Sequence, residues 1–201
     1  MKKSERTRQY IIEQCAPVFN AKGYAATSIG DIMRQTGLTK GGIYGNFASK
    51  DEMALLAFEH NAQIVMRQLR EKIREQPTAP LKLNAMLDFF GTYVSNPPVE
   101  GGCPILNTAV EADDLYPELR QHVVNAFALL RQSVEKILAR GIEFGQIKPN
   151  ADVRVFAVTF LAILEGAIVM GRVSNDEGLL HTAIGRVRRM IDEELVKKEN
   201  R

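Results

Sequence analysis

The sequence lacks several features that would place the protein in another class. Its 201 residues include only two cysteines, Cys15 and Cys103, which make no disulfide framework, so a reducing cytoplasm is the expected compartment. The most apolar stretch, residues 155–171, is interrupted by Glu165, and no apolar run approaches the roughly 18 residues of a membrane span. The basic N-terminus has neither a long apolar segment nor a small-residue cleavage site, so no signal peptide is expected.

Sequence signatures of catalysis are missing as well. There is no GxSxG, no phosphate-binding loop, no HExxH and no acid–base pair beside a nucleophile, so we expect neither an enzyme nor a cofactor. His60, His122 and His181 are scattered and lack ligand spacing, so no metal site is expected.

Net charge is small but unevenly placed. The chain carries +2 overall, whereas residues 1–50 hold eight Lys/Arg and three acids, a net of +5, which leaves −3 for residues 51–201. A basic N-terminal segment, followed by a mildly acidic remainder of the chain, indicates a polyanionic partner, of which nucleic acid is the commonest. Chance clustering of solvated charges would give the same count.

Strand alternation and hairpin turns are absent, and helical periodicity extends over nearly the whole chain. The predicted fold is all-α, with about nine helices near residues 4–22, 28–36, 38–47, 50–76, 80–96, 103–114, 117–144, 152–173 and 176–197. Gly23, Gly37, Pro77 and Gly145 follow four of them, which is typical of helix ends.

The stretch TGLTKGGIYGNFASKDE, residues 36–52, places three glycines, Gly41, Gly42 and Gly45, in a short helix. Each costs about 1 kcal/mol relative to alanine in a helix interior. With the preceding helix and the turn at Gly37, the stretch matches a helix-turn-helix. In that motif the second helix enters the major groove, which is about 12 Å wide, so glycines would let the backbone approach DNA closely.

The same region, extended to TSIGDIMRQTGLTKGGIYGNFASKDEMALLAF, resembles the DNA-binding domain of the tetracycline-repressor (TetR-type) family of bacterial transcription regulators. The residues that carry the resemblance are Phe19, Gly23, Tyr24, Thr27, Ile32, Gly37, Leu38, Thr39, Lys40, Gly41, Ile43, Tyr44, Asn46, Phe47, Ser49, Lys50 and Met53. Asn46 stands where histidine is common. The resemblance implies a DNA-binding domain at residues 1–50 and a helical effector-binding and dimerisation domain at residues 51–201.

By the same resemblance, one set of residues would bind DNA. Thr27, Lys40, Tyr44, Asn46 and Lys50 would hold phosphates, and Thr39, Gly41, Gly42 and Arg34 would lie nearest the bases. Two alternatives stay open: Tyr44 packs the three-helix unit, and Arg34 and Lys50 are solvated surface charges. We expect a homodimer, because a unit this small reads few base pairs. The last two helices are the expected interface, through Phe160, Leu164, Ala167, Leu180, Ile184, Val187 and Ile191; alternatively they complete the core of one chain.

The resemblance further implies an effector pocket among the middle helices. The expected lining residues are Phe58, Phe89, Phe90, Tyr93, Cys103, Leu106, Asn107, Phe127 and Leu130. Cys103 begins a predicted helix, where a thiol pKa is lowered, so it is either an electrophile sensor or a small buried residue. Glu165 pairs across the dimer, binds a cationic ligand or satisfies a neighbouring backbone group.

We therefore predict a ligand-responsive DNA-binding transcriptional regulator. It would be a homodimeric repressor that a small-molecule or electrophile signal releases from a palindromic double-stranded operator. The alternatives are an enzyme and a constitutive architectural DNA binder without a ligand.

Overall fold

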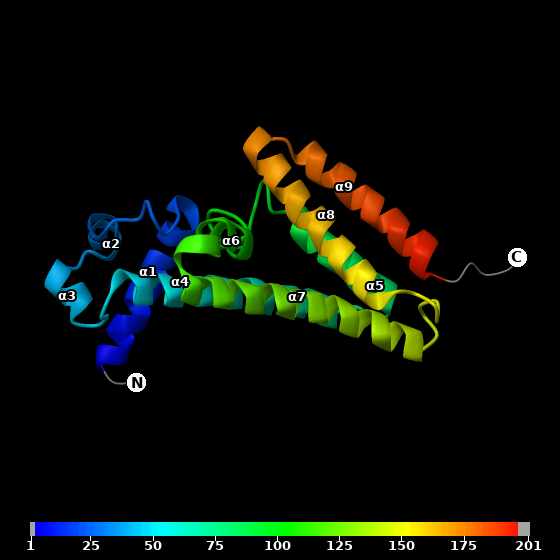
Figure 1. The fold of residues 1–201 in the computed structure, drawn as a ribbon, viewed down its shortest axis with the longest axis horizontal. Coiled ribbons are helices and arrows are strands. Elements are labelled where there is room, and N and C mark those ends of the chain that lie inside the picture. The colour runs from blue at the N-terminus through cyan, green and yellow to red at the C-terminus, as the bar shows by residue number, and fades with distance from the viewer. Residues whose placement is uncertain (1–2, 197–201) are drawn as a thin grey trace, which may run out of the picture. The chain divides into compact units, whose positions relative to one another are not determined.

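The computed structural model describes the backbone of residues 3–196 and the side chains of residues 4–112 and 116–196. Over these residues the chain forms nine α-helices and one short π-helix, and no β-strand, which confirms the all-α prediction. In chain order they are α1 (Lys3–Lys22), α2 (Ile29–Thr36), α3 (Lys40–Tyr44), α4 (Lys50–Arg74), α5 (Ala79–Gly91), α6 (Pro104–Leu115), α7 (Pro117–Glu143), α8 (Val153–Ser174), α9 (Glu177–Met190) and the π-helix η1 (Ile191–Leu195). Figure 1 labels α1 to α9.

Three helices differ from their predicted bounds by more than two residues. α3 is a single short turn and a half, because Gly45 serves as its C-cap and the chain leaves the helix before Phe47. α5 ends at Gly91 and is capped by Thr92, whereas the prediction extended it to residue 96. α9 ends at Met190 and passes into the π-helix; the predicted end at residue 197 lies outside the described residues.

Packing divides the chain into two compact units. The first consists of residues up to Met66 together with Pro97–Ala126, and the second of Arg67–Asn96 together with residues from Phe127 onward. Helices α4 and α7 contribute residues to both. These boundaries describe packing, whereas the predicted division at residue 50 assigns DNA binding and effector binding to different segments. That functional division stays a prediction.

The core of the first unit joins α1, α2, α3 and the start of α4. Its buried apolar side chains include Ile11, Ile32, Ile43, Phe47 and Met53. Full burial of one such side chain contributes about 1.5–3 kcal/mol. Ile43 and Phe47 together therefore offset the cost of the glycines in α3, which is about 1 kcal/mol for each glycine.

A hydrogen-bonded joint within the first unit fastens the end of α1 to the loop before α6. The Asn20 side chain donates to the carbonyls of Glu100 and Gly102, at 2.7 and 3.0 Å. The Asn107 side chain donates to the carbonyls of Asn20 and Gly101, at 3.1 and 2.7 Å. Gly101 has φ +89°, and a Cβ there would lie 2.8 Å from the Ala21 backbone, so only glycine fits.

The second unit is built on the packing of α8 against α9, with α5 touching both. α8 runs without a break through Glu165 and, by length and composition alone, is long and apolar enough to cross a membrane. The prediction that no stretch approaches a membrane span was therefore too strict. Less than half of its most apolar window, 44%, is buried inside the chain, and the buried part includes Phe156, Phe160 and Leu164.

Candidate nucleic-acid interface

The turn between α2 and α3 has the local geometry that its sequence predicts. Ser28 caps α2 and forms a capping box with Asp31, so both partners satisfy backbone donors that the helix start leaves free. Gly37 ends α2 in the left-handed region, at φ +70°, where glycine carries no steric cost. Thr39 then caps α3 by accepting the N–H of Gly42 at 3.2 Å. These caps fix the two helices of the helix-turn-helix.

The glycines of α3 leave its outer surface bare, and the packing of the chain does not require that. Gly41 and Gly42 are exposed, and Ile43 alone in α3 is buried. A Cβ added to Gly41 would meet nothing within 4 Å, and one added to Gly42 would come no closer than 3.4 Å, to the Thr39 hydroxyl. Alanine would fit both positions within the free chain. Packing within the free chain therefore does not explain why these two positions are glycine.

Polar and aromatic groups flank this bare surface. Lys40 is exposed, and its ammonium group lies 6.0 Å from the centroid of the Tyr44 ring, which is 38% exposed. The Asn46 side chain, two residues beyond the end of α3, donates to the Gly42 carbonyl at 2.8 Å. Lys50 lies 4.5 Å from the centre of the Tyr24 ring, a cation–π distance.

Arg8 is a structural residue of this unit that the sequence patterns did not single out. Its guanidinium donates to the Asn46 carbonyl and to the Glu52 carboxylate, and it lies 4.4 Å over the Phe47 ring. The Arg8 ion pair, followed by the N–H of Ala48, lowers the pKa of the Glu52 carboxyl group. Arg8 thereby ties α1 to the residues that follow α3 and to the start of α4. Its partners lie about 40 residues away in sequence, beyond any spacing rule.

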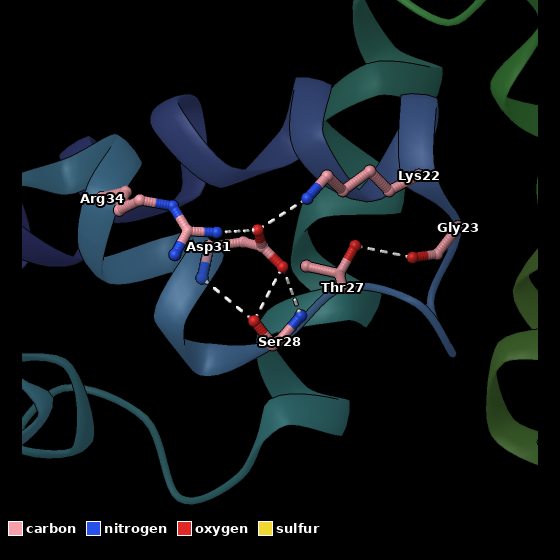
Figure 2. A network of polar contacts seen from close by, with 6 residues as sticks. All are labelled: Lys22, Gly23, Thr27, Ser28, Asp31 and Arg34. Carbon is pink, nitrogen blue, oxygen red and sulfur yellow. Dashed lines mark hydrogen bonds and ion pairs between the residues drawn. The ribbon is translucent and has the colours of Figure 1, made fainter.

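The Asp31 carboxylate, in the first turn of α2, forms ion pairs with Lys22 and Arg34 (Figure 2). One carboxylate oxygen, Oδ1, accepts from Lys22 Nζ at 2.6 Å and from the Arg34 guanidinium, and the other accepts the N–H of Ser28 at 2.9 Å. Lys22 and then the Ser28 hydrogen bonds hold the pKa of this carboxyl group well below its usual range. Arg34 is thus an ion-paired side chain that remains 73% exposed.

Thr27, a predicted phosphate contact, is buried in the free chain, and its contact with DNA stays a prediction. Its side chain is only 1% exposed, and its hydroxyl donates to the Gly23 carbonyl at 2.6 Å, as Figure 2 shows. A hydroxyl has one hydrogen, so in this arrangement Thr27 has none to donate to a phosphate. It stabilises the turn between α1 and α2. The motif match could not reveal this, because it carries no information on burial.

The predicted effector-lining residues are divided between the two units. Phe58 and Asn107 both line a cavity of about 20 Å³ in the first unit, together with Phe19, Asn20, Gly23, Tyr24, Ala54, Asn61, Pro104, Thr108 and Glu111. That volume has room for a single water molecule. Cys103 is buried at the N-cap of α6 in the same unit, and Leu106 is half-buried there. In the second unit Phe89, Phe90 and Tyr93 pack as an aromatic cluster, while Leu130 is buried and Phe127 half-buried.

The predicted interface residues lie inside the single chain, and their part in a dimer stays a prediction. Phe160, Leu164, Ala167, Leu180, Ile184, Val187 and Ile191 are all buried within the single chain, none more than 5% exposed. In the free chain they pack against its other residues. The exposed side of α8 carries a different apolar set, which we call the α8 outer face: Val155, Val158, Ala162, Gly166, Val169, Met170 and Val173. Their spacing by threes and fours places them along one side of the helix.

Comparison with known proteins agrees with this architecture. Residues 11–57 match the family model for bacterial regulatory proteins of the tetR family, and residues 79–187 match the model for the tetracyclin repressor-like C-terminal domain. A TetR transcriptional regulator from Chloroflexus aurantiacus J-10-FL is 36% identical, with a TM-score of 0.94 over 98% of this chain and 100% of that one. A TetR-family regulator from Cytophaga hutchinsonii is also 36% identical, with a TM-score of 0.91 over 98% and 99%.

A third TetR-family regulator, a cysteine mutant solved with 26-bp double-strand operator DNA, shares the fold at 17% identity, with a TM-score of 0.81 over 90% of this chain and 94% of that one. At that identity the likeness speaks for the fold alone. The two family models and the two relatives at 36% identity carry the assignment. The helix-turn-helix geometry and the helical body lead to the same conclusion: this chain belongs to the TetR family of DNA-binding transcriptional regulators.

Proposed function

We propose that the protein is a homodimeric repressor that reads a palindromic operator with α3 and leaves it when an effector binds. The observation that carries the DNA-reading part is the bare surface of Gly41 and Gly42, which the free chain does not need. Lys40, Tyr44 and Asn46 border this surface and would hold the phosphates on either side. The site of action is the cytoplasm, where bacterial DNA lies.

Selection of duplexes from a random-sequence pool by the purified protein tests operator reading. We expect a palindrome whose half-sites lie about one helical turn, or a multiple of it, apart (34–36 Å per turn). Recovery of sequences without two-fold symmetry, or of none above the starting pool, would contradict the proposal. Transcription of a reporter behind the selected duplex should then fall when the protein is present; a rise would identify an activator.

The α8 outer face supports the dimer part of the proposal. A run of valines with Ala162 and Gly166 at its centre leaves apolar surface in water, and a second copy of the same face would cover it while the small residues allow close approach of the helices. α9 would lie beside it, as the family resemblance implies.

A pair of matched substitutions tests this interface. Val158, in the α8 outer face, is 49% exposed, and Val110, on α6, is 80% exposed. Val158→Glu should convert the dimer to monomer in sedimentation experiments, because it buries a charge without a partner. Val110→Glu makes the same chemical change at another exposed valine and should leave the dimer intact. Equal behaviour of the two variants would remove α8 from the interface.

Effector release is the remaining part of the proposal. We place the effector beside Phe58 and Asn107, next to the joint that fastens α6 to α1. A tenfold loss of operator affinity requires a difference of about 1.4 kcal/mol between the two states. A metabolite panel, scored by fluorescence anisotropy of a labelled operator, should yield a compound with at least this effect. Thr108→Leu, which fills the cavity, should abolish the response and preserve DNA binding.

One observation favours a second candidate, a constitutive DNA binder without an effector. The cavity beside Phe58 has room for one water molecule only, so an effector would have to enlarge it. Operator affinity that is indifferent to the whole panel, in a protein that still selects a palindrome, would establish this alternative.

A further inference from the structure

One carboxylate oxygen of Asp31 serves two cations at once. Lys22, the last residue of α1, and Arg34, in the last turn of α2, both reach Oδ1, while Oδ2 accepts the backbone N–H and the hydroxyl of Ser28 (Figure 2). Asp31 belongs to the capping box of α2, yet the cap uses only one of its two oxygens. The other oxygen is committed to the two cations, which a cap does not require.

The carboxylate and its partners differ sharply in exposure. The Asp31 side chain is 9% exposed, whereas Lys22 is 50% and Arg34 is 73% exposed. Arg34 folds back along α2, so that its Nη1 lies 3.7 Å from the place where a Cβ on Gly30 would stand. A guanidinium has five N–H donors. Asp31 engages Nη2, and the exposure of Arg34 leaves its other donors accessible to a ligand.

We propose that Asp31 is a positioning residue that sets operator specificity through Arg34. It holds the Arg34 guanidinium in one orientation for a contact with a base edge, and it cancels one of the two positive charges beside it. The inference rests on the proposed function, in which α3 reads the operator, and on the expectation that Arg34 of α2 lies near the bases. Its consequence is that Asp31 restrains binding to arbitrary DNA while it supports binding to the operator.

Two physical arguments support this role. A long, flexible side chain that is already oriented loses less conformational entropy when it binds, and an oriented guanidinium favours the base that matches it in geometry. An unpaired Lys22 or Arg34 would instead be drawn to any phosphate, since attraction to phosphates carries no sequence information. The lowered pKa of Asp31 keeps the carboxylate charged throughout the neutral range, so it can pair with Lys22 and Arg34 there.

The competing explanation is that Asp31 only caps α2. Loss of a cap would weaken the fold and reduce affinity for every duplex by the same factor. The proposal predicts changes in opposite directions for the operator and for arbitrary DNA. The ratio of the two affinities therefore separates the explanations, whatever happens to stability.

The probes are a duplex selected from a random pool by the unmodified protein and a scrambled duplex of the same composition. Affinities are measured by anisotropy over a range of salt concentrations. Asp31→Asn should bind the scrambled duplex several-fold more tightly and reduce the selectivity ratio about tenfold, the discrimination of one oriented base contact. Its salt dependence on the scrambled duplex should steepen by about 0.9, the value for one additional phosphate contact.

Four further variants fix the interpretation. Glu13→Gln removes the same charge from an exposed position of α1 and should leave the ratio within twofold. Asp31→Glu keeps the charge and the preferred capping-box residue but shifts the carboxylate by one methylene, so the ratio should fall while scrambled-duplex affinity stays constant. Arg34→Gln changes an exposed side chain and should lower the ratio without unfolding the protein. In the Arg34→Gln background, adding Asp31→Asn should change the ratio by less than twofold.

The outcomes are decisive in each direction. A selectivity ratio that is unchanged in Asp31→Asn, or that falls just as far when Arg34 is already glutamine, overturns the inference. If Asp31→Asn does not fold, Asp31→Glu and Arg34→Gln test the inference instead. Both variants must then lower the ratio of operator affinity to scrambled-duplex affinity. Failure of the unmodified protein to select any duplex refutes the proposed function instead.

Discussion

Replacing Gly41 by alanine should make the protein more stable and a poorer DNA binder. The new methyl group would meet nothing within 4 Å in the free chain, and Gly41 has no left-handed backbone conformation to lose. Alanine is favoured over glycine in a helix by up to about 1 kcal/mol. For a chain of this length, a gain of that size raises the melting temperature by roughly 2–4 °C.

The effect on DNA binding has the opposite sign. If α3 lies in the major groove with its backbone against the duplex, a methyl group at position 41 must displace DNA or tilt the helix. Inserting one methyl group into a close-packed contact costs about 1–3 kcal/mol. Operator affinity should therefore fall by roughly 5- to 150-fold, which is the same free energy expressed as a ratio.

Thermal unfolding and operator anisotropy, measured on the same preparation, test both effects. Gly145→Ala is the matched control: this glycine has φ +68° with open space around it, so alanine there should lower stability by about 1 kcal/mol and leave operator affinity unchanged. The reasoning is refuted if Gly41→Ala stabilises the protein and binds the operator as tightly as the unmodified chain does. Glycine at position 41 would then have no role in clearance.

Three further predictions follow from buried groups. Thr27→Val should lower stability by about 1 kcal/mol through the lost hydrogen bond to Gly23, with operator affinity per folded molecule unchanged in titrations corrected for the folded fraction. Because the pKa of the Asp31 carboxyl group is lowered in the folded protein, the ionised group stabilises the fold fully above about pH 4, the pKa of Asp in the unfolded chain, and this stabilisation is lost as the pH falls further. The difference in melting temperature between the unmodified protein and Asp31→Asn should therefore shrink from pH 7 to pH 3. Burial raises the pKa of the Cys15 thiol to about 12, so mass spectrometry after iodoacetamide treatment at pH 8 should find Cys15 unmodified in the native protein and modified after unfolding.

Local chemistry accounts for most of what the sequence could predict. The all-α fold follows from helical periodicity, and the stops at Gly23, Gly37 and Gly145 coincide with backbone of positive φ. Ser28 caps α2, whereas the Thr27 hydroxyl donates backwards to the carbonyl of Gly23. Each of these decisions depends on residues within four positions of one another.

Features that depend on contacts between residues distant in sequence could not be predicted from the sequence pattern. α8 is apolar nearly all round, so its pattern does not tell which side packs against α9; the residues predicted for a partner, such as Leu164, pack the chain itself, and Val158 on another side remains exposed. Arg8 and Glu52 are separated by 44 positions, and no helical spacing connects them. The ion pairs of Asp31 with Lys22 and with Arg34 depend on how α1 packs against α2, which no local pattern reveals.

Gly101 lies so close to the Ala21 backbone that a side chain cannot fit there, whereas Gly41 has room for one. The two positions represent two kinds of glycine in this chain. A library of every single replacement, sorted first for soluble expression and then for silencing of a fluorescent reporter, would lose variants of position 101 at the first sort, because any side chain there collides with the Ala21 backbone. Variants of position 41 would pass that sort and fail the second. The order of loss would thus separate, in a single experiment, the glycines that the chain needs to fold from those that it needs to meet its partner.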